Sequence, residues 1–251
     1  MLLEHPSGRV LAELTLSFNG DPNENDLQPL LDVLTRQKRP SIHTLVIGDR
    51  VDQISWYHVG DLSKVWKSLP QLTHLEITAG TFTLGKIDAP YLMEATFRTG
   101  GLDAADARSI ARMKAPILYE LKVYFGDSEY GGDATVKDIA PLLARTDLPE
   151  LKSLGLVNAA FTDELCRLLP GSNLLRQLEK LDLSLGILTD AGAAILAQHA
   201  DAFAHLDVLD LSESYLTPAG VKLVKRIARK VIVADQREAD EPEDRYVSLG
   251  E

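Results

Sequence analysis

The chain has 251 residues, of which 45% are hydrophobic, so it is long enough to bury a substantial core. Its formal net charge is -11, because 37 Asp and Glu outnumber 26 Lys and Arg, and a surface of that sign repels phosphate backbones. A single cysteine excludes an intramolecular disulfide, and no apolar run approaches membrane-spanning length. We therefore expect a soluble cytoplasmic protein that binds neither nucleic acid nor membranes.

One phrase recurs along the chain and is clearest at residues 178–196, LEKLDLSLGILTDAGAAIL. Its leucines at Leu178, Leu181 and Leu183 have the L-x-x-L-x-L spacing that is typical of the strand of a leucine-rich repeat. Similar copies predict nine strands, whose first core positions are Leu11, Ile42, Leu72, Leu92, Leu118, Leu151, Leu178, Leu206 and Ala228. Most of these starts are separated by about 20–30 residues, which fits this class of repeat.

Helical patterns lie between the strands. We expect helices over residues 25–35, 59–68, 104–113 and 134–145. Thr162, Thr189 and Thr217 stand where N-caps belong, and Pro218 suits the first helical position because its missing N–H costs nothing there. The shortest repeat has β-branched residues around 81–83 instead, which predicts an extended segment on its outer side.

The widths of the elements predict the overall shape. Parallel strands stack about 4.8 Å apart while helices are about 10 Å across, so a helix behind each strand forces the stack to curve. The predicted fold is an α/β leucine-rich-repeat horseshoe, a right-handed β-α superhelix with about nine parallel strands on the concave face and helices on the convex face. We expect one domain over residues 1–251, with residues 1–41 as N-terminal cap and first repeat and residues 228–251 as C-terminal cap.

The residues between the leucines should point into the concave face, which the curvature leaves uncovered. Near its middle, five positions combine both signs of charge with an aromatic ring: Glu76, Arg98, Glu120, Lys122 and Tyr124. Tyr and Arg are the residue types that most often anchor interfaces, so these five are candidate partner-binding residues. The alternative is a solvated sheet face with incidental charges.

Two loops should share the rim at the C-terminal ends of the strands, about 15 Å apart. One covers residues 54–57 and contains Trp56, and the other covers residues 126–133 and contains Tyr130. We expect Trp56 and Tyr130 to extend the partner-binding surface, although Trp56 could instead fill the core between outer segments.

A small-ligand or metal site in the pocket between these two loops is the alternative function. Asp127, Glu129 and Asp133 would be its ligands. The loop matches a calcium-binding loop only loosely, because Gly131 replaces a ligand and Asp138 replaces the usual closing Glu. A solvated turn explains the same residues better.

Catalytic patterns are weak throughout. Asp182 and Asp210 fall at equivalent positions of adjacent strands and could form an acid/base pair, but each belongs to the L-D-L-S phrase that the repeat itself explains. Cys166 lies among leucines on the apolar side of a helix and reads as a small core residue. The six histidines show no metal spacing. We predict no enzymatic activity, no cofactor and no metal.

The C-terminal segment combines a basic helix with an acidic stretch at residues 235–244. Opposite charges so close in sequence indicate that the tail folds back, with Tyr246, Val247 and Leu249 covering the open end of the core. The alternative is a disordered acidic tail.

Some phrases are not required by the repeat. They are EYGGDAT at residues 129–135, ISW at 54–56 and the ending RYVSLGE at 245–251. With LDLSLGILTDAGAA at 181–194, they make the chain resemble a family of bacterial cytoplasmic leucine-rich-repeat proteins of the ribonuclease-inhibitor-like type. This resemblance implies a horseshoe with no assigned enzymatic activity that acts through protein–protein interaction, and it transfers no catalytic residue. The predicted function is therefore a scaffold for an unidentified protein partner.

Overall fold

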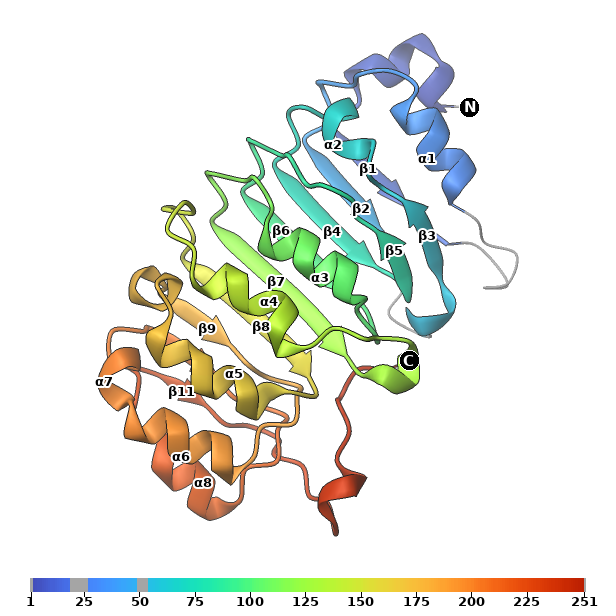
Figure 1. Cartoon of the computed structure of the whole chain (residues 1–251). Coiled ribbons are helices and arrows are strands. Elements are labelled where there is room, and N and C mark those ends of the chain that lie inside the picture. The colour runs from blue at the N-terminus through green and yellow to red at the C-terminus, as the bar shows by residue number, and fades with distance from the viewer. Residues whose placement is uncertain (1, 19–26, 49–53, 251) are drawn as a thin grey trace.

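The computed structural model describes residues 2–18, 27–48 and 54–250. Within these residues nine strands form one parallel sheet in the order β1-β2-β4-β6-β7-β8-β9-β10-β11. The strands are β1 (Glu13–Leu16), β2 (Thr44–Ile47), β4 (His74–Thr78), β6 (Glu94–Arg98), β7 (Glu120–Gly126), β8 (Ser153–Ala159), β9 (Lys180–Asp182), β10 (Val208–Asp210) and β11 (Val231–Ile232). The fold is an α/β leucine-rich-repeat horseshoe, and the nine predicted strands are confirmed (Figure 1).

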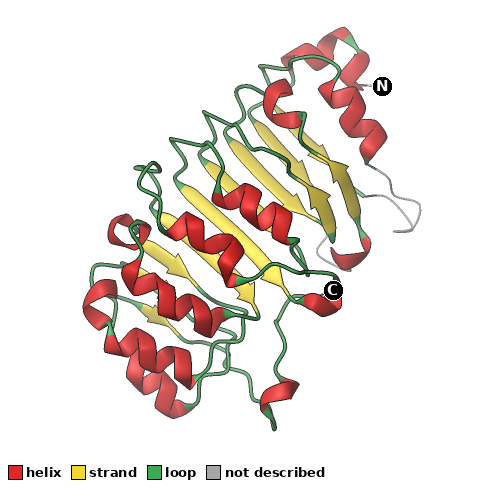
Figure 2. Cartoon of the chain, in the orientation of Figure 1, coloured by secondary structure: helices red, strands yellow, loops and turns green. Residues whose placement is uncertain are grey.

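The helices lie together on one side of the main sheet (Figure 2). They are α1 (Gln28–Thr35), α2 (Val65–Ser68), α3 (Ala104–Ala111), α4 (Val136–Leu143), α5 (Thr162–Leu168), α6 (Asp190–Gln198), α7 (Ala200–Phe203) and α8 (Pro218–Val224). The helices expected over 104–113 and 134–145 are confirmed as α3 and α4. The helix expected over 25–35 is α1, and its first two expected residues lie outside the described residues.

The helix expected over residues 59–68 is wrong for most of its length. The chain instead forms β3 (His58–Asp61), which pairs in parallel with β5 (Thr81–Thr83), the extended outer segment that the sequence predicted. Gly60 explains the difference, because its φ of 95° is left-handed and a side chain there would meet the Gln28 amide. Only the last turn of the predicted helix remains, as α2.

At the N-terminus, 3-10 turns at Leu2–Glu4 and Pro6–Val10 precede β1. Leu3 is buried in the core, and the Arg36 guanidinium lies 3.0 Å from the Glu4 carboxylate. The segment therefore lies against the first repeat.

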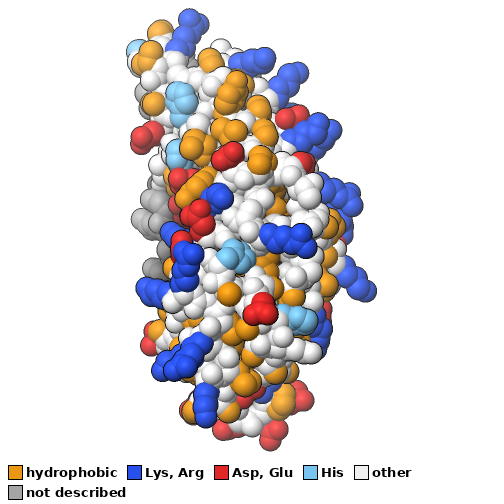
Figure 3. Space-filling view, turned by 90° about the vertical axis from the view of Figure 1, so that its left-hand side faces the viewer, with side chains coloured by type: hydrophobic (Ala, Val, Ile, Leu, Met, Phe, Trp, Pro, Cys, Tyr) orange, Lys and Arg blue, Asp and Glu red, His pale blue; other side chains and the backbone are white. Residues whose placement is uncertain are grey.

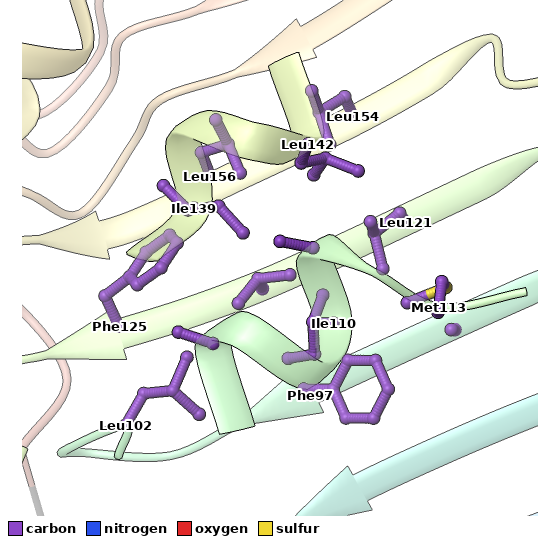
Figure 4. Close-up of a cluster of buried hydrophobic side chains, with 14 of the residues drawn as sticks. Phe97, Leu102, Ile110, Met113, Leu121, Phe125, Ile139, Leu142, Leu154 and Leu156 are labelled. Carbon is purple, nitrogen blue, oxygen red and sulfur yellow. The ribbon is translucent and has the colours of Figure 1, made fainter. Parts of the chain in front are cut away.

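The repeat leucines form a continuous core between the sheet and the helices. Figure 4 shows its middle, where Leu121 and Phe125 of β7 and Leu154 of β8 meet Ile110 of α3 and Ile139 of α4. These side chains are at most 2% exposed. Each contributes about 1.5–3 kcal/mol by leaving water, so the alternation along each strand fixes which face turns outward.

On the convex side, an aspartate at the start of one helix reaches the next. The Asp163 carboxylate accepts hydrogen bonds from the Thr189 amide (2.9 Å) and hydroxyl (2.6 Å). Asp190 makes the same two bonds to Thr217, at 2.9 and 2.6 Å. Thr189 and Thr217 are the predicted N-caps of α6 and α8. Pro218 takes the place of the aspartate in α8, so the ladder stops there.

Glycines make room for this ladder. A methyl group on Gly192 would collide with the Asp163 carboxylate, and one on Gly220 would collide with that of Asp190. The Thr-Asp-Ala-Gly motif at residues 189–192 therefore links neighbouring helices. Its threonine begins the helix, its aspartate holds the next helix, and its glycine accepts the previous aspartate.

The predicted N-cap at Thr162 is wrong. Thr162 is fully buried, and its hydroxyl donates to the Ala159 carbonyl instead of accepting from a helix amide. The preceding residue, Phe161, stands at the N-cap position and packs edge-on against Phe125, with 5.0 Å between ring centroids. This aromatic contact holds the start of α5 against the core.

Candidate protein-binding surface

The concave face of the sheet is ordered and uncovered. The strand centres pair as the repeat predicted, from Thr15 opposite Val46 to Asp210 opposite Ile232. The described helices all lie on the other face (Figure 1). Parallel sheets are normally covered on both faces, so this bare face is the natural place for a partner.

Four side chains of β6, β7 and β9 form a cluster on the concave face. They are Arg98, Lys122, Tyr124 and Asp182. The Lys122 amine lies 2.9 Å from the Asp182 carboxylate and 5.5 Å from the centre of the Tyr124 ring. The Arg98 guanidinium lies 5.0 Å from the same ring centre. Two cations therefore pack against one aromatic ring, and each such contact is worth about 0.5–2 kcal/mol.

This cluster keeps Lys122 charged. Burial alone would lower the pKa of its amine, but the Asp182 carboxylate and the Tyr124 hydroxyl outweigh burial and hold that pKa above its usual value. Tyr124 is only 5% exposed. It supports the two cations from below, so the expected exposed aromatic anchor is in fact covered.

The cluster leaves Arg98 with unused donors. Its only hydrogen bond within the described part of the chain is a long one, 3.4 Å, to the Tyr124 hydroxyl, and its buried Nε has no acceptor there. A guanidinium has five N–H donors, and buried donors are normally paired. Among the described residues, Arg98 therefore makes only this weak side-chain hydrogen bond and pairs with no carboxylate.

The concave face carries three carboxylates on β4, β6 and β7, at the first residues of β6 and β7 and in the middle of β4. Glu76, Glu94 and Glu120 lie on neighbouring strands, and His74 approaches Glu94 at 3.5 Å. They border a shallow hollow of about 150 Å³. Glu120 also borders a second hollow of about 210 Å³ that continues toward Asp182. The sequence predicted Glu76, Arg98, Glu120 and Lys122 on this face; Arg98 and Lys122 meet at the Tyr124 ring, whereas Glu76 and Glu120 border the first hollow.

Asp182 and Asp210 are adjacent, as expected, but each is occupied locally. Asp182 accepts from the amide and hydroxyl of Ser184, at 3.0 and 2.6 Å, and Asp210 accepts from those of Ser212, at 2.9 and 2.6 Å. These bonds close the turn after each strand. The L-D-L-S phrase thus has a structural explanation.

The C-terminal tail crosses the rim at the C-terminal ends of the strands (Figure 1, red). The Ser248 amide donates to the Leu185 carbonyl at 2.8 Å. The buried Asn158 side chain then pairs with the backbone of Leu249 in both directions, at 2.6 and 2.8 Å. We call residues 246–250 the rim strap.

The tail folds back as predicted, but it covers a different place. Val247 is buried against the rim, whereas Tyr246 is 63% exposed and does not close the core. Arg237 fixes the return: its guanidinium donates to the Tyr246 carbonyl at 2.7 Å and stacks 4.4 Å from the Tyr215 ring centre. The strap therefore runs along the strand ends instead of over the last repeat.

The rim strap fills the space between the two predicted rim loops. The Gly250 carbonyl accepts from the Ser55 hydroxyl, and its backbone packs directly on the Tyr130 ring and on Gly100. Tyr130 is therefore partly covered, while Trp56 is 53% exposed. The phrases ISW, EYGGDAT and RYVSLGE thus meet at one point.

The structure does not support the metal-site alternative. The Asp127 carboxylate accepts from the Glu129 amide at 2.7 Å, and that of Asp133 accepts from the Ala104 amide at 2.5 Å. Among the described residues, no three His, Cys, Asp or Glu side chains are grouped to hold a metal. Asp127 thus shapes the turn between β7 and α4, and Asp133 ties that turn to the start of α3.

The opposite rim carries residues that the sequence analysis missed. Tyr91 and Met93 precede β6, and Ile117 and Tyr119 precede β7; they are 48%, 42%, 39% and 46% exposed. Figure 3 views this rim and shows hydrophobic side chains beside acidic ones toward its left, concave side. The sequence did carry a signal for these residues. The position immediately before the strand is polar in the neighbouring repeats but apolar before β6 and β7.

These features define a protein of leucine-rich-repeat architecture with an open concave face. A solved structure of a protein from Bacteroides fragilis is similar over 100% of this chain and 72% of its own, with 28% identity and a TM-score of 0.86. A complex of TLR13 with single-stranded RNA (15% identity, TM-score 0.47) matches 90% of this chain and 29% of its own. An internalin from Listeria monocytogenes (15%, TM-score 0.38) matches 82% and 65%.

Neither a protein-family model nor a curated protein matches the chain. Within the described residues, no helix is long and apolar enough to cross a membrane.

Proposed function

We propose that this chain is a non-enzymatic scaffold of a bacterial cytoplasm that binds a protein partner through its concave face. The observation that carries this proposal is Arg98, whose guanidinium stands on the uncovered face with donors that no described residue accepts. A protein backbone or carboxylate is the acceptor that fits a guanidinium best. Trp56, exposed on the rim, extends the surface, and the fully buried Cys166 suits a reducing compartment.

We also propose that the repeats are of the ribonuclease-inhibitor-like type. The helices that follow several of the strands support this assignment. The concave face offers shallow hollows of about 150 and 210 Å³, too open for a reaction that must exclude water. Asp182 and Asp210 are committed to their turns. Both observations favour a binding role over a catalytic one.

The test is affinity capture from cells that express the chain, compared between the wild type and Arg98→Gln. Arg112→Gln is the matched control, because Arg112 is an exposed arginine at the end of α3 on the convex side. We expect Arg98→Gln to reduce the amount of captured partner about tenfold or more, because a central interface arginine often contributes strongly to binding. Equal capture by all three proteins would refute the proposal.

Tyr124 should not be replaced in this test. It is 5% exposed beneath Arg98 and Lys122, so Tyr124→Ala would remove packing as well as contact. Glu120→Gln is a cleaner second variant, since Glu120 is half-buried and has no ion pair among the described residues.

A further inference from the structure

The exposed apolar side chains before β6 and β7 form one patch. The Met93 carbonyl accepts the Tyr119 amide at 2.7 Å and the Glu120 amide at 3.0 Å, so the two turns are joined. Met93 and Tyr119 each stand one residue before the paired Glu94 and Glu120. Tyr91 and Ile117 each stand two residues earlier. We call Tyr91, Met93, Ile117 and Tyr119 the turn patch.

The repeat does not require these residues. The equivalent position before the strand is His43, Thr73, Lys152, Glu179 or Asp207 in other repeats. Four of the nine exposed large hydrophobic residues of the described chain are gathered here. Scattered apolar side chains are normal on a surface, but a contiguous group marks an interaction site.

Acidic side chains border the turn patch on its concave side. Glu94 and Glu120 follow Met93 and Tyr119 directly, and Glu76 lies on the next strand around the shared hollow. Of the basic residues near them, Lys122 is held 2.9 Å from Asp182, His74 lies 3.5 Å from Glu94, and Lys180 borders the second hollow with Glu120. The three carboxylates therefore present a negative field beside an apolar surface.

We propose that the turn patch and Glu76, Glu94 and Glu120 together dock a protein segment that carries Lys or Arg next to apolar side chains. Apolar contact would supply affinity, and the carboxylates would select and steer the basic residues. Nucleic acid has the wrong charge for this surface. A second copy docked about a two-fold axis would bring a second set of the same glutamates into the interface. This inference rests on the proposed protein-binding function and names the chemistry of the partner.

The experiment is selection of a random displayed peptide library against the full chain, followed by fluorescence anisotropy of the selected peptides. We expect peptides enriched in Lys or Arg and in apolar residues. Their affinity should fall about tenfold with Met93→Ser/Tyr119→Ser and about tenfold with Glu94→Gln/Glu120→Gln. It should also fall as salt rises from about 50 to about 500 mM, because screening weakens charge contacts.

Matched controls lie on the convex face. Leu168→Ser/Leu223→Ser removes two side chains of similar exposure, 40% and 48%, and Glu164→Gln removes an exposed carboxylate of α5. These variants should bind the peptides like the wild type. Melting temperatures of all variants check that each one folds.

Several results would overturn the inference. They are selection of no peptide, selected peptides without basic residues, or binding that the controls reduce as much as the patch variants do. Dimerisation in sedimentation runs that Met93→Ser/Tyr119→Ser abolishes would assign the patch to a second copy. Peptides that respond to Arg98→Gln but to neither patch variant would refute this inference and leave the proposed function standing.

Discussion

Asp106 is a buried carboxyl group that should make stability depend on pH. It lies on α3, is 4% exposed, and accepts a hydrogen bond of 2.8 Å from the Leu84 amide. Burial raises the pKa of Asp106 to about 6 from its ordinary 3.8; the Leu84 bond opposes this rise and the nearby Asp103 adds to it. At 1.36 kcal/mol per pKa unit, this difference corresponds to about 3 kcal/mol.

The sign follows from proton binding. Between pH 3.8 and about 6 the folded chain holds a proton on Asp106 that the unfolded chain releases, so this group favours folding less as pH rises through that window. About 2 kcal/mol of the effect should fall between pH 4.5 and pH 7.5, because part is already lost at the lower value.

Asp106→Asn tests this reasoning. The amide keeps an oxygen for the Leu84 N–H but cannot ionise. Urea unfolding of both proteins should show that the variant gains about 2 kcal/mol relative to the wild type between about pH 4.5 and about pH 7.5. Lowered carboxyl pKa values elsewhere, such as that of Asp138, affect both proteins equally and cancel. A stability difference that stays constant with pH would refute the argument.

Three further predictions concern single contacts. Asn158→Ala removes both bonds to Leu249 and should cost about 2 kcal/mol and speed proteolysis of the tail; unchanged cleavage rates would contradict the strap. Gly192→Ala should destabilise the wild type by about 1 kcal/mol, because the new methyl meets the Asp163 carboxylate and the Leu188 side chain, and it should destabilise the Asp163→Ala variant less, because only the Leu188 contact remains. A double-mutant cycle in urea measures this coupling. Cys166 should resist thiol reagents in the folded protein and react after unfolding, because burial raises its pKa; a fast native reaction would show that α5 opens.

The strands and the concave face were predictable because the repeat states them directly. Leucine spacing fixes which residues face inward, so the neighbours of Leu121, such as Glu120 and Lys122, had to lie on the concave side. The N-caps at Thr189 and Thr217 were also predictable, because each threonine bonds to an amide only two residues further along the chain.

Features that depend on distant contacts were not predictable. Tyr124 occupies an outward position, but its burial depends on Arg98, which is 26 residues away. The extended conformation of β3 depends on pairing with β5 and on the approach of Gln28 to Gly60. The course of the rim strap depends on the bonds of Asn158 to Leu249, which is 91 residues away in the sequence.

The rim strap has a consequence for how the chain folds. Repeat arrays usually fold through nearest neighbours, so their end units can open one at a time. Here the bonds from Leu249 to Asn158 and from Gly250 to Ser55 span 91 and 195 residues of sequence. Such contacts raise the contact order and the entropy cost of closure, and they slow folding. If the rim strap leaves with the final repeats, their opening also breaks the contacts at Ser55 and at Asn158 of β8, which couples distant parts of the array.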